Sequence, residues 1–398
     1  MPENTDVVVV GGGPTGLTAA LFLVDAGVNV RVLESRTSIY DDPRAATFHP
    51  PTLQMFEKSG ITKRLHEMGI LCPRWQFRGR EEGVIAEFDL GILADITPYP
   101  YRLQCEQHKL VAAIDKLLSA HPKCSIHYGA TVEAVEQNAD SVSVRTADGA
   151  VYRASFVIGA DGGRSVVRKS QDIAFDGFTY EERFLVITTG FDFEQLGFAY
   201  SCYVSDPREW CALFKVPGAG PPGVWRVVFA TSSQTPAEQL LDHEYARCKL
   251  DGFIPAARPY SIVHTNLYTV HQRVAETYRR ERVLLAGDAA HVNNPLGGMG
   301  MNFGIHDAVD LADKISRVLR GEPEQLLGLY DRQRRHVANA FLQAMTIQNK
   351  HVLEEKDSSV RRQRIQEMAE IARDSEKSRA FLMRTAMFQG LRAAKQVH

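Results

Sequence analysis

The chain begins with a run of valines that leads directly into a glycine-rich turn, and this feature constrains the fold more than any other. Val7 to Val10 have the character of a buried strand, and Gly11, Gly13 and Gly16 follow in the spacing G-x-G-x-x-G. The first glycine of such a motif permits a tight turn, the second lets the backbone approach a phosphate, and the third lets the next helix pack on the strand. The sequence therefore predicts a strand, a turn and a helix of the dinucleotide-binding type.

The residues after the turn supply the helix and the second strand that this arrangement requires. Pro14 suits a first helical turn, and Val28 to Leu33 form a second apolar run that ends at Glu34. A carboxylate at this distance from the turn accepts both hydroxyls of an adenosine ribose. The pattern does not separate FAD from NAD. The predicted dinucleotide site comprises Gly11, Gly13, Pro14, Thr15, Gly16, Glu34, Ser35 and Arg36.

Length and composition limit the classes of protein to which the chain can belong. Its 398 residues, 44% of them apolar, suit two domains. The formal net charge of −2 gives no reason to expect a nucleic-acid partner. The N-terminus is acidic where a signal peptide is basic, and no apolar run approaches the roughly 20 residues that span a bilayer. The six cysteines form no C-x-x-C pair. We therefore expect a cytoplasmic protein without a membrane partner and without a bound metal.

The middle of the chain has the pattern of an antiparallel sheet. Residues 76–100 are a short segment with aromatic residues and interruptions by turn residues, as in hairpins. The segment from Phe184 to Phe229 is rich in Val, Thr, Phe, Tyr and Trp. Gly218 to Gly223 also matches G-x-G-x-x-G, but it contains two prolines and precedes the strand-like Val224 to Ala230. We therefore predict a turn there and no second nucleotide site.

Two further motifs, read together with the first, carry a resemblance. They are the run Asp161-Gly162-x-x-Ser165-x-x-Arg168 and the run from Gly287-Asp288-Ala289-Ala290-His291 to Pro295-x-Gly297-Gly298-Met299-Gly300-Met301-Asn302. With Pro43-Arg44-Ala45 and Gln104 between them, they resemble the class A flavoprotein aromatic monooxygenases. This is the group of para-hydroxybenzoate hydroxylase and of the phenol and hydroxyphenylpropionate hydroxylases. The resemblance covers residues 5–345.

The resemblance implies the role of several residues at an FAD site. Asp288 would accept a hydrogen bond from the ribityl chain or its neighbours, although a role as a cap of its own segment is the alternative. Arg44 would lie on the pyrophosphate side, near the entry of the nicotinamide. Asp161 and Arg168 would bridge phosphates, with a solvated turn as the alternative. The further cofactor residues implied are Arg44, Ala45, Gln104, Asp161, Gly162, Asp288, Pro295, Gly298, Gly300, Met301 and Asn302.

The chemistry of a flavin explains the glycines that precede the last of these motifs. Gly297 to Gly300 lead into a predicted helix with an apolar face, which ends at Gly321. The positive N-terminus of this helix would lie where negative charge accumulates on the N1 and C2 carbonyl of a reduced flavin.

The activity implied is that of a single-component monooxygenase. It would bind FAD non-covalently, use NADH or NADPH and O2, and hydroxylate a small phenolic or hydroxylated N-heteroaromatic ring through a flavin 4a-hydroperoxide. Asp41 and Asp42, near Arg36, favour NADH because they repel a 2′-phosphate. The alternatives are a flavin reductase, a halogenase, or a non-catalytic FAD-binding redox module. No W-x-W-x-x-P run supports the halogenase.

Substrate residues are harder to predict. A base that takes a phenolic proton near neutral pH points to histidine or to a tyrosine relay. Tyr203 and His271 rank first as catalytic residues, beside Arg44, and for each a structural role is the alternative. The other candidates are His49, His264 and Tyr268. Arg226 is expected to face solvent on its strand, with a role in clamping a substrate carboxylate as the alternative.

The fold expected is α/β, with a Rossmann-like FAD-binding domain of the GR2 type and an inserted antiparallel-sheet substrate domain. Because Gly11 and Asp288 must meet on one cofactor, the FAD domain is discontinuous and comprises residues 1–75, 101–178 and 261–345. Residues 76–100 and 179–260 form the substrate domain. Residues 346–398 form C-terminal helices that cap a core or pair subunits, which makes a homodimer possible.

Overall fold

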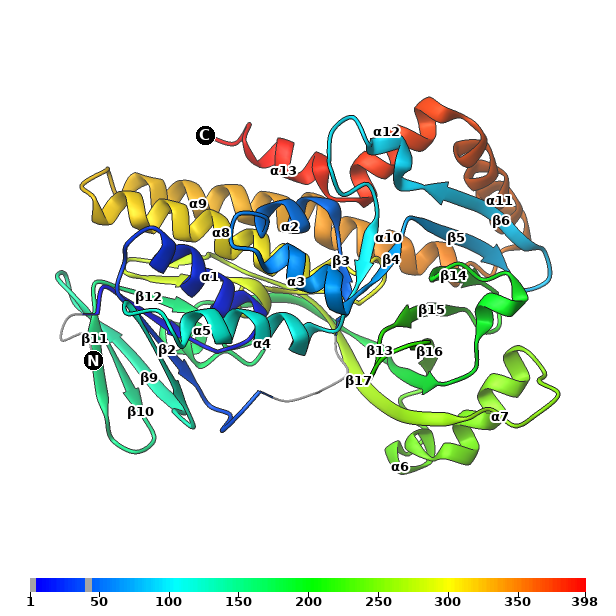
Figure 1. Ribbon diagram of the computed structural model, residues 1–398, viewed down its shortest axis with the longest axis horizontal. Coiled ribbons are helices and arrows are strands. Elements are labelled where there is room, and N and C mark those ends of the chain that lie inside the picture. Colours follow the sequence, from blue (N-terminus) through cyan, green and yellow to red (C-terminus); the bar gives the residue numbers. More distant parts are fainter. Residues whose placement is uncertain (1–4, 40–44) are drawn as a thin grey trace.

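The computed structural model describes residues 5–39 and 45–398, which form two large sheets with helices packed on them. Two long strands, β13 (Phe175–Thr189) and β17 (Ile262–Ala275), run from the region of the first sheet into the second. Helices α8 (Gly300–Leu319) and α9 (Gln325–Val337) lie above the first sheet, at the upper left of Figure 1. The first sheet and these helices form the α/β part that the glycine turn predicted.

The first sheet has six strands in the order β18-β19-β12-β1-β2-β8, and all neighbours are parallel except β18 and β19. Its central strand is the valine run, buried along its whole length as a strand covered on both faces must be. The strands are β1 (Val7–Val10), β2 (Val30–Glu34), β8 (Cys124–Tyr128), β12 (Phe156–Gly159), β18 (Arg279–Arg280) and β19 (Val283–Leu285).

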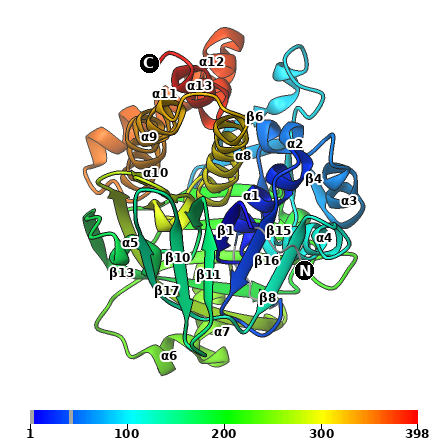
Figure 2. The same ribbon diagram turned by 90° about the vertical axis from the view of Figure 1, so that its left-hand side faces the viewer.

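Helices cover this sheet, and two small sheets flank it. Helix α1 (Pro14–Asp25) packs against α8 and α4 (Gln107–Leu118), as the end-on view in Figure 2 shows. The flanking sheets are β9 (Val132–Gln137), β10 (Val142–Thr146) and β11 (Val151–Ala154), and β3 (Thr47–Phe48), β4 (Ile70–Cys72) and β7 (Arg102–Gln104). The short helices are α2 (Pro50–Met55), α3 (Ile61–Met68), α5 (Val166–Ser170) and the 3-10 turns at Leu90–Leu93, Phe193–Leu196 and Gly287–Ala289.

The second large sheet has eight strands in the order β20-β17-β13-β16-β15-β14-β5-β6. It is antiparallel except for the pair β14 and β5. The remaining strands are β5 (Arg74–Gly79), β6 (Gly83–Asp89), β14 (Ser201–Ser205), β15 (Cys211–Val216), β16 (Val224–Thr231) and β20 (His291–Val292). The predicted antiparallel sheet is therefore confirmed, and Gly218 to Gly223 form the turn between β15 and β16.

The two faces of the eight-stranded sheet have different coverings. The outer face packs its side chains with α7 (His243–Phe253) in one aromatic core, beside α6 (Ala237–Leu241). The inner face packs on the C-terminal helices and on Leu296, in the segment before α8. Because paired residues share a face, the register assigns Tyr203, Ala212, Val228 and Val186 to the inner face.

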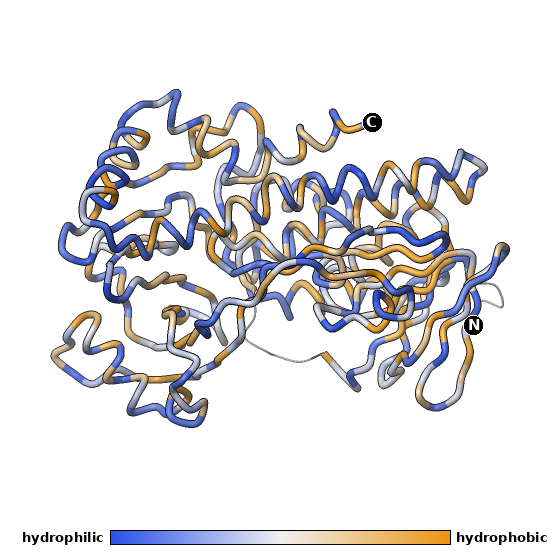
Figure 3. The backbone as a smooth tube through the Cα atoms, turned by 180° about the vertical axis from the view of Figure 1, so that it is seen from behind, coloured by the Kyte–Doolittle hydropathy of each residue, from blue (hydrophilic) through white to orange (hydrophobic). Residues whose placement is uncertain are grey.

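The C-terminal helices complete the covering of the inner face. Helix α9 continues through a π-helical segment (Ala338–Gln343) into α10 (Ala344–Leu353). The chain then forms α11 (Ser358–Arg373), α12 (Ser375–Thr385) and α13 (Phe388–Ala394). Helix α11 has no buried residue, and its hydrophilic colour contrasts with the apolar central strands in Figure 3.

The predicted domain limits at residues 75, 178 and 345 fall inside continuous elements, which are β5, β13 and α10. Strand β13 passes through the limit at residue 178, and β17 lies in the eight-stranded sheet although residues 261–345 were assigned to the FAD domain. Both strands pair with each other along nearly their whole length, which local sequence patterns do not show. Within the described residues, no helix has the length and apolar character needed to cross a membrane.

Candidate active site

The glycine turn has the geometry of a phosphate-binding loop. Gly11 has φ +105°, and a Cβ there would lie 2.4 Å from the carbonyl oxygen of Ala160. A Cβ on Gly16 would lie 1.9 Å from the carbonyl oxygen of Gly11, whereas a Cβ on Gly13 would meet nothing within 4 Å. The first and third glycines are thus required by the protein itself. The open space at Gly13 is where another molecule approaches the backbone.

Glu34 closes the end of this turn. Its carboxylate accepts hydrogen bonds from the backbone N–H of Gly12 at 2.6 Å and from that of Arg36 at 2.8 Å. The side chain is only half buried, so its remaining acceptor positions are accessible to ribose hydroxyls. Ser35 and Arg36 are exposed beside it.

The two glycine-rich segments, far apart in the sequence, meet at Thr15. A Cβ on Gly287 would lie 2.5 Å from Thr15 Oγ1, and one on Gly304 would lie 2.4 Å from the same atom. Helices α1 and α8 therefore bring their N-terminal ends together. No side chain caps the first N–H groups of either helix. Asp288 is exposed in a segment that is otherwise buried. Two helix N-termini and this carboxylate thus surround one place suited to a dinucleotide.

Asp161 and Arg168 have their partners within the protein. The Asp161 carboxylate accepts hydrogen bonds from the Ser165 hydroxyl at 2.5 Å and from the N–H of Val166 at 2.7 Å. The Arg168 guanidinium donates to the carbonyl oxygens of Gly163 and Ala289, each at 2.9 Å. The first interaction caps α5, and the second joins the Asp161 motif to the Asp288 motif. The structure therefore gives both side chains internal partners in place of phosphates.

A buried charged cluster holds the Asp288 motif on α8 and α9; we call Asp307, His291 and Arg334 the closed cluster. Asp307 accepts hydrogen bonds from the N–H of Gly287 at 3.0 Å, from His291 Nε2 at 2.7 Å and from Arg334 Nε at 2.6 Å. Burial alone would raise the pKa of Asp307, but Arg334 and His291 hold it at about 2. Asp307 therefore stays ionised, and the turn at Gly287 is fixed.

The loop before α8 is held from two sides. His49 Nε2 donates to the carbonyl oxygen of Gly297 at 3.0 Å, and the N–H of Gly297 donates to Tyr203 Oη at 3.0 Å. Asn302 Nδ2 donates to the carbonyl oxygens of Thr47 and Gly298, each at 2.8 Å. The loop is therefore ordered by groups from three different elements.

A second set of amides holds the same loop against α10. Asn294 Nδ2 donates to the carbonyl oxygen of Thr346 at 2.9 Å, and Asn349 Nδ2 donates to that of Leu296 at 3.1 Å. Gln343, the last residue of the π-helical segment, donates to the carbonyl oxygen of Val292 at 3.0 Å. The π-helical segment thus holds the chain that leads into the loop, and π-helical segments are frequent at functional sites.

A second buried polar cluster lies between this loop and the inner face; we call His49, Arg102, Gln104, Ser201 and Tyr203 the open cluster. Arg102 is 3% exposed, and its Nη1 donates to Ser201 Oγ at 3.3 Å. Three buried atoms of the cluster have no hydrogen-bond partner: His49 Nδ1, Arg102 Nε and Gln104 Nε2. Burial, assisted by Arg102, lowers the pKa of His49 to about 3, and burial raises that of Tyr203. Orphaned buried polar atoms of this kind, here two donors and the accepting Nδ1 of His49, indicate a bound molecule or water.

The structure brings some predicted catalytic residues to this place and not others. Tyr203 belongs to the open cluster. His271 does not: it is exposed on the opposite face of β17 from the buried Gln272, and its Nδ1 pairs with Thr179 Oγ1 at 2.9 Å. Arg44, Asp41 and Asp42 lie outside the described residues.

Two further sequence expectations concern the inner face. The expectation that Arg226 faces solvent is wrong, because the register places it on the inner face opposite Phe214 and Thr188. Arg102 and Ser201 were missed altogether. The available signal was the alternation of Arg102-Leu103-Gln104, where Leu103 enters the main core and both neighbours point the other way.

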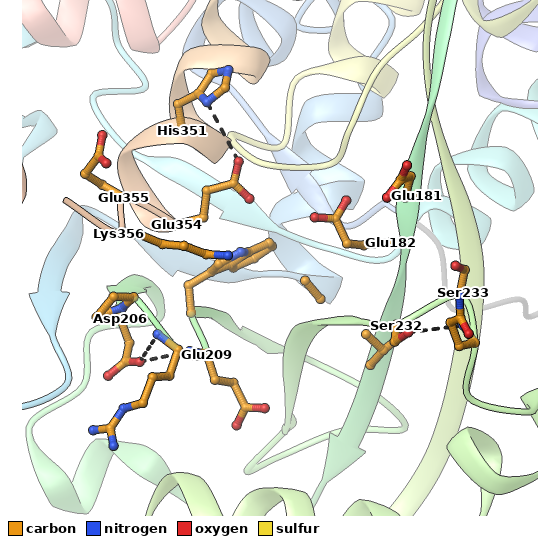
Figure 4. Close-up of a pocket in the computed structure, with 16 residues that line it drawn as sticks. Glu181, Glu182, Asp206, Glu209, Ser232, Ser233, His351, Glu354, Glu355 and Lys356 are labelled. Carbon is orange, nitrogen blue, oxygen red and sulfur yellow. Dashed lines mark hydrogen bonds and ion pairs between the residues drawn. The ribbon is translucent and has the colours of Figure 1, made fainter.

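A surface groove of about 740 Å³ lies elsewhere, between the ends of β13 and β16 and the C-terminal end of α10. Figure 4 shows that carboxylates dominate its lining, among them Glu181, Glu182, Asp206 and Glu354. Lys350 pairs with Glu182 and with Glu354. No residue of the glycine turn or of the open cluster lines this groove, so we assign the site to the turn and the open cluster.

The residues present fit FAD. The open space at Gly13 and the uncapped start of α1 suit a pyrophosphate, and Glu34 suits a ribose. The unpartnered amide of Gln104 and the carboxylate of Asp288 suit a polyhydroxyl chain. The N-terminus of α8 suits the negative side of a flavin ring.

Comparison with known proteins gives a consistent result. A family model described as an FAD binding domain matches residues 4–345. Para-nitrophenol 4-monooxygenase of a Pseudomonas species is 33% identical, over 98% of this chain and 97% of that protein. The 6-hydroxy-3-succinoylpyridine 3-monooxygenase HspB of Pseudomonas putida is 32% identical, over 84% of this chain and 85% of its own length. A 3-(3-hydroxy-phenyl)propionate/3-hydroxycinnamic acid hydroxylase of Mycolicibacterium smegmatis is 31% identical, but the match covers 61% of that longer protein.

Solved structures agree with the sequences. The crystal structure of p-nitrophenol 4-monooxygenase PnpA from Pseudomonas putida DLL-E4 has a TM-score of 0.91 at 32% identity and covers 98% of both chains. The flavin-dependent monooxygenase PieE, in complex with FAD and substrate, has a TM-score of 0.80 at 23% identity. It covers 99% of this chain and 72% of that chain, a likeness of fold alone.

Proposed function

Because the chain belongs to the FAD-binding monooxygenase family that includes the aromatic hydroxylases, we propose that it adds one oxygen atom from O2 to a small phenol or hydroxypyridine, with NAD(P)H as reductant. The observation that carries this proposal is the meeting of two uncapped helix N-termini at Thr15, next to a buried polar cluster beneath an ordered loop. The first feature suits the cofactor and the second suits a small polar substrate.

The relatives narrow the substrate class. The two that match over most of their own length are named for oxygenation at position 4 of para-nitrophenol and at position 3 of a 6-hydroxypyridine. In both names this ring carbon bears the substituent and lies across the ring from the hydroxyl. We therefore propose a substrate with a hydroxyl group and, para to it, a substituent at the carbon that is attacked.

Bound FAD supplies the electrons and the oxygen chemistry, and the protein supplies the geometry. Tyr203 and His49 fix the Gly297 loop against the inner face. Apolar side chains of that face, among them Val186 and Val228, exclude water from the ring. The loop and the inner face thus form opposite walls of a site for a flat ring.

Three basic side chains support a route for the nicotinamide nucleotide. Arg164 and Arg273 both lower the pKa of His271, after the larger effect of its burial, so the three side chains lie close together. They lie beside the Asp161 and Asp288 motifs, since a Cβ on Gly163 would contact Val292, the register partner of Arg273. We propose that the two arginines attract the phosphates of NAD(P)H and that His271, whose lowered pKa favours its neutral form, lies beside them in place of the catalytic role predicted for it.

The test is a panel of phenols and hydroxypyridines, each added to the FAD-loaded protein with NADH or NADPH. At least one para-substituted member is expected to increase NAD(P)H consumption and to yield an oxygenated ring in mass spectrometry. Asp288→Ala is expected to lower FAD occupancy, by about 1.5 to 3 kcal/mol for a hydrogen bond to a charged group. Bound FAD with no substrate-stimulated consumption would leave the redox module as the better proposal.

A further inference from the structure

We propose that α11 and α12 form a strap that opens to admit the aromatic substrate to the open cluster. The strap comprises residues 358–385. Helix α11 packs beside β6, and α12 packs beside the 3-10 turn at Leu90–Leu93, at the upper right of Figure 1. This inference rests on the proposed function, since it takes the open cluster as the place of the substrate, and it adds the route by which the substrate arrives.

The side chains of the open cluster are enclosed. None of the five is more than 7% exposed, and His49, Gln104 and Ser201 are fully buried. A substrate therefore reaches the cluster only after a covering segment has moved. The segments that cover the inner face are the loop before α8, helix α10 and the strap.

The strap is the most weakly held of these coverings. The buried Asn294 amide joins the loop to the Thr346 carbonyl oxygen of α10, and the Leu353 carbonyl oxygen of α10 accepts a hydrogen bond from the buried Ser205 hydroxyl at 3.2 Å. Helix α11, by contrast, contributes no buried residue, and α12 contributes three. Segments with few buried contacts are those that open locally.

Two arginines fasten the strap to the β5–β6 hairpin and to the segment after it. Arg361 donates to the two carboxylate oxygens of Glu82 at 2.6 and 3.0 Å. Arg379 donates to those of Asp95 at 2.8 and 2.6 Å, and to the carbonyl oxygen of Ile92 at 2.6 Å. The Glu82 and Asp95 side chains are 35% and 60% exposed. Because water and salt compete for exposed ion pairs, the loss of one of them changes an equilibrium by no more than about fivefold.

The strap begins and ends at segments suited to act as hinges. Residues 354–357, between α10 and α11, are not helical. Met387, between α12 and α13, has φ +73° although it is not a glycine. Hinges are a few residues at the ends of elements, and a side chain at such a φ is strained unless its surroundings hold it. Since α13 packs on α9, the strap can rotate while α10 and α13 stay in place.

The strap closes over aromatic side chains that adjoin the open cluster. The ring of Phe381, on α12, lies 4.7 Å from that of Phe88 and 5.9 Å from that of Trp75. The Trp75 ring lies 5.7 Å from the Tyr203 ring and 5.4 Å from the Arg102 guanidinium. Movement of Phe381 therefore uncovers an aromatic surface along which a flat ring can reach the open cluster.

Opening of the strap has a kinetic signature that a change in the binding site does not have. If the substrate enters and leaves only through the open state, both rate constants are proportional to the open fraction. The dissociation constant stays the same, because the closed complex is unchanged. Loss of one ion pair of the strap should therefore raise both rate constants by one common factor of about two to five.

The experiment mixes 4-nitrophenol with the FAD-loaded protein, without nicotinamide nucleotide, and follows the flavin absorbance by stopped flow at several probe concentrations. Arg379→Gln and Arg361→Gln should each raise the association and dissociation rate constants about two- to fivefold, and the double variant should raise them further. High salt should also raise both rate constants in the unmodified protein, with less effect in the double variant.

Arg145→Gln is the matched control. Arg145 forms an ion pair with Glu133 at 3.1 Å, and both side chains are 51% exposed. The pair lies on β9 and β10, in a small sheet outside the inner face. Its loss should leave both rate constants unchanged.

A thiol placed in the strap reports its opening without any substrate. Leu382→Cys is made together with Cys248→Ser, because Leu382 is 1% exposed and Cys248 is an exposed cysteine. Peptide mass spectrometry then locates the cysteines that react with dithionitrobenzoate. The introduced thiol should react faster than the buried Cys202 and Cys211, and Arg379→Gln should raise its rate by the same factor as the association of the probe.

Rate constants that stay unchanged in the double variant overturn the inference, and so does an introduced thiol that reacts no faster than Cys202. A change of the dissociation constant alone also overturns it. Failure of the proposed function is a different result. Either 4-nitrophenol does not bind, and the thiol alone then decides whether the strap opens, or the probe binds and no member of the phenol and hydroxypyridine panel stimulates NAD(P)H consumption.

Discussion

The closed cluster and the open cluster are two buried polar clusters of similar composition near the N-terminal part of α8, and they differ in charge balance. In the closed cluster, the Arg334 guanidinium and the Asp307 carboxylate form an ion pair at 2.6 Å, with His291 on the second carboxylate oxygen. In the open cluster, Arg102 donates to the neutral hydroxyl of Ser201, and no ion pair of the described residues includes it. Both contain an arginine and a histidine, and neither is exposed to solvent.

The difference in charge balance indicates that the closed cluster has a structural role and the open cluster a functional one. Asp307 uses its acceptors on Gly287, His291 and Arg334, and so fixes the turn that presents Asp288. His291 Nδ1 lacks a partner there, but the charges are balanced. The open cluster holds three orphaned polar atoms and an uncompensated cation. Since buried polar groups normally have hydrogen-bond partners, the open cluster, which lacks several, is the one that indicates a ligand site.

The largest effect on stability is expected from opening the closed cluster. Asp307→Asn leaves Arg334 buried without its anion, and breaking a buried ion pair in this way costs about 3 to 5 kcal/mol. Urea unfolding of the FAD-free protein measures the loss. Asp313→Asn is the control on the same helix, because this carboxylate is 61% exposed and its ion pair contributes less than about 1 kcal/mol. Equal losses in the two variants would contradict the role of the closed cluster.

A smaller effect is expected from pH, through two fully buried histidines: His49 of the open cluster, and His306 of α8, whose Nε2 pairs with Thr52 Oγ1 at 2.9 Å. Burial is the main cause that lowers the pKa of both His49 and His306 from 6.5 to about 3, with Arg102 and Arg334 as second causes. The unfolded chain therefore binds more protons than the folded chain between these values. Stability is complete above about pH 6.5 and is lost as the pH falls, by about 2 kcal/mol for both histidines between pH 6.5 and about pH 5.5.

This loss can be separated from that of Asp307, whose pKa falls from 3.8 to about 2 and whose contribution therefore disappears only below about pH 4. His306→Gln should reduce the slope of stability against pH by about half, since one of the two histidines is gone. His351, which is 62% exposed, is the control, and His351→Gln should leave the slope unchanged. A slope that is the same in all three proteins would contradict the neutral state of His306.

The sequence predicted the elements whose signals are local. The valine run, the three glycines and Glu34 lie within one short segment, and their geometry requires only that segment and its neighbours. That Gly11 and Asp288 lie at one cofactor was predicted from the resemblance to a known family, and the contact of Gly287 with Thr15 is how the structure brings the two segments together. The predicted strand-like run from Phe184 includes only the last part of β13, and the full length of β13 and β17 depends on tertiary packing.

The open cluster was only partly predictable for a physical reason. Tyr203 was a candidate because tyrosine is a known type of proton relay, yet nothing local in the sequence distinguished it from Tyr268. Arg102 lies on a strand of three residues, too short to show a period, and its importance depends on the absence of a carboxylate from elements far away in the sequence. His271 was favoured by its position just before a motif, whereas the strand period turns it to the other face.

An intermediate effect is expected from Tyr203→Phe, which leaves the N–H of Gly297 without its acceptor in the open cluster. An unsatisfied buried donor costs about 1 to 3 kcal/mol, and we expect a value near the lower end because the aromatic ring is kept. The variant should also bind 4-nitrophenolate several-fold more weakly while FAD occupancy is retained. If the variant binds 4-nitrophenol as tightly as the unmodified protein, Tyr203 is not part of the substrate site and only holds the Gly297 loop.

The smallest effect on stability is expected from closing the open cluster. Ser201 Oγ lies 3.3 Å from Arg102 Nη1, so Ser201→Asp places a carboxylate beside the buried guanidinium. Ser201→Asn is the matched control, because it adds nearly the same volume at a buried position without the charge. At neutral pH the aspartate variant should be more stable than the asparagine variant by about 1 kcal/mol, since it completes an ion pair whose desolvation offsets much of its attraction. The aspartate variant should lose 4-nitrophenolate binding at least about tenfold relative to the asparagine variant. If the aspartate variant binds 4-nitrophenolate as tightly as the asparagine variant does, Arg102 is not where the anion binds. The two clusters would then differ in composition but not in function.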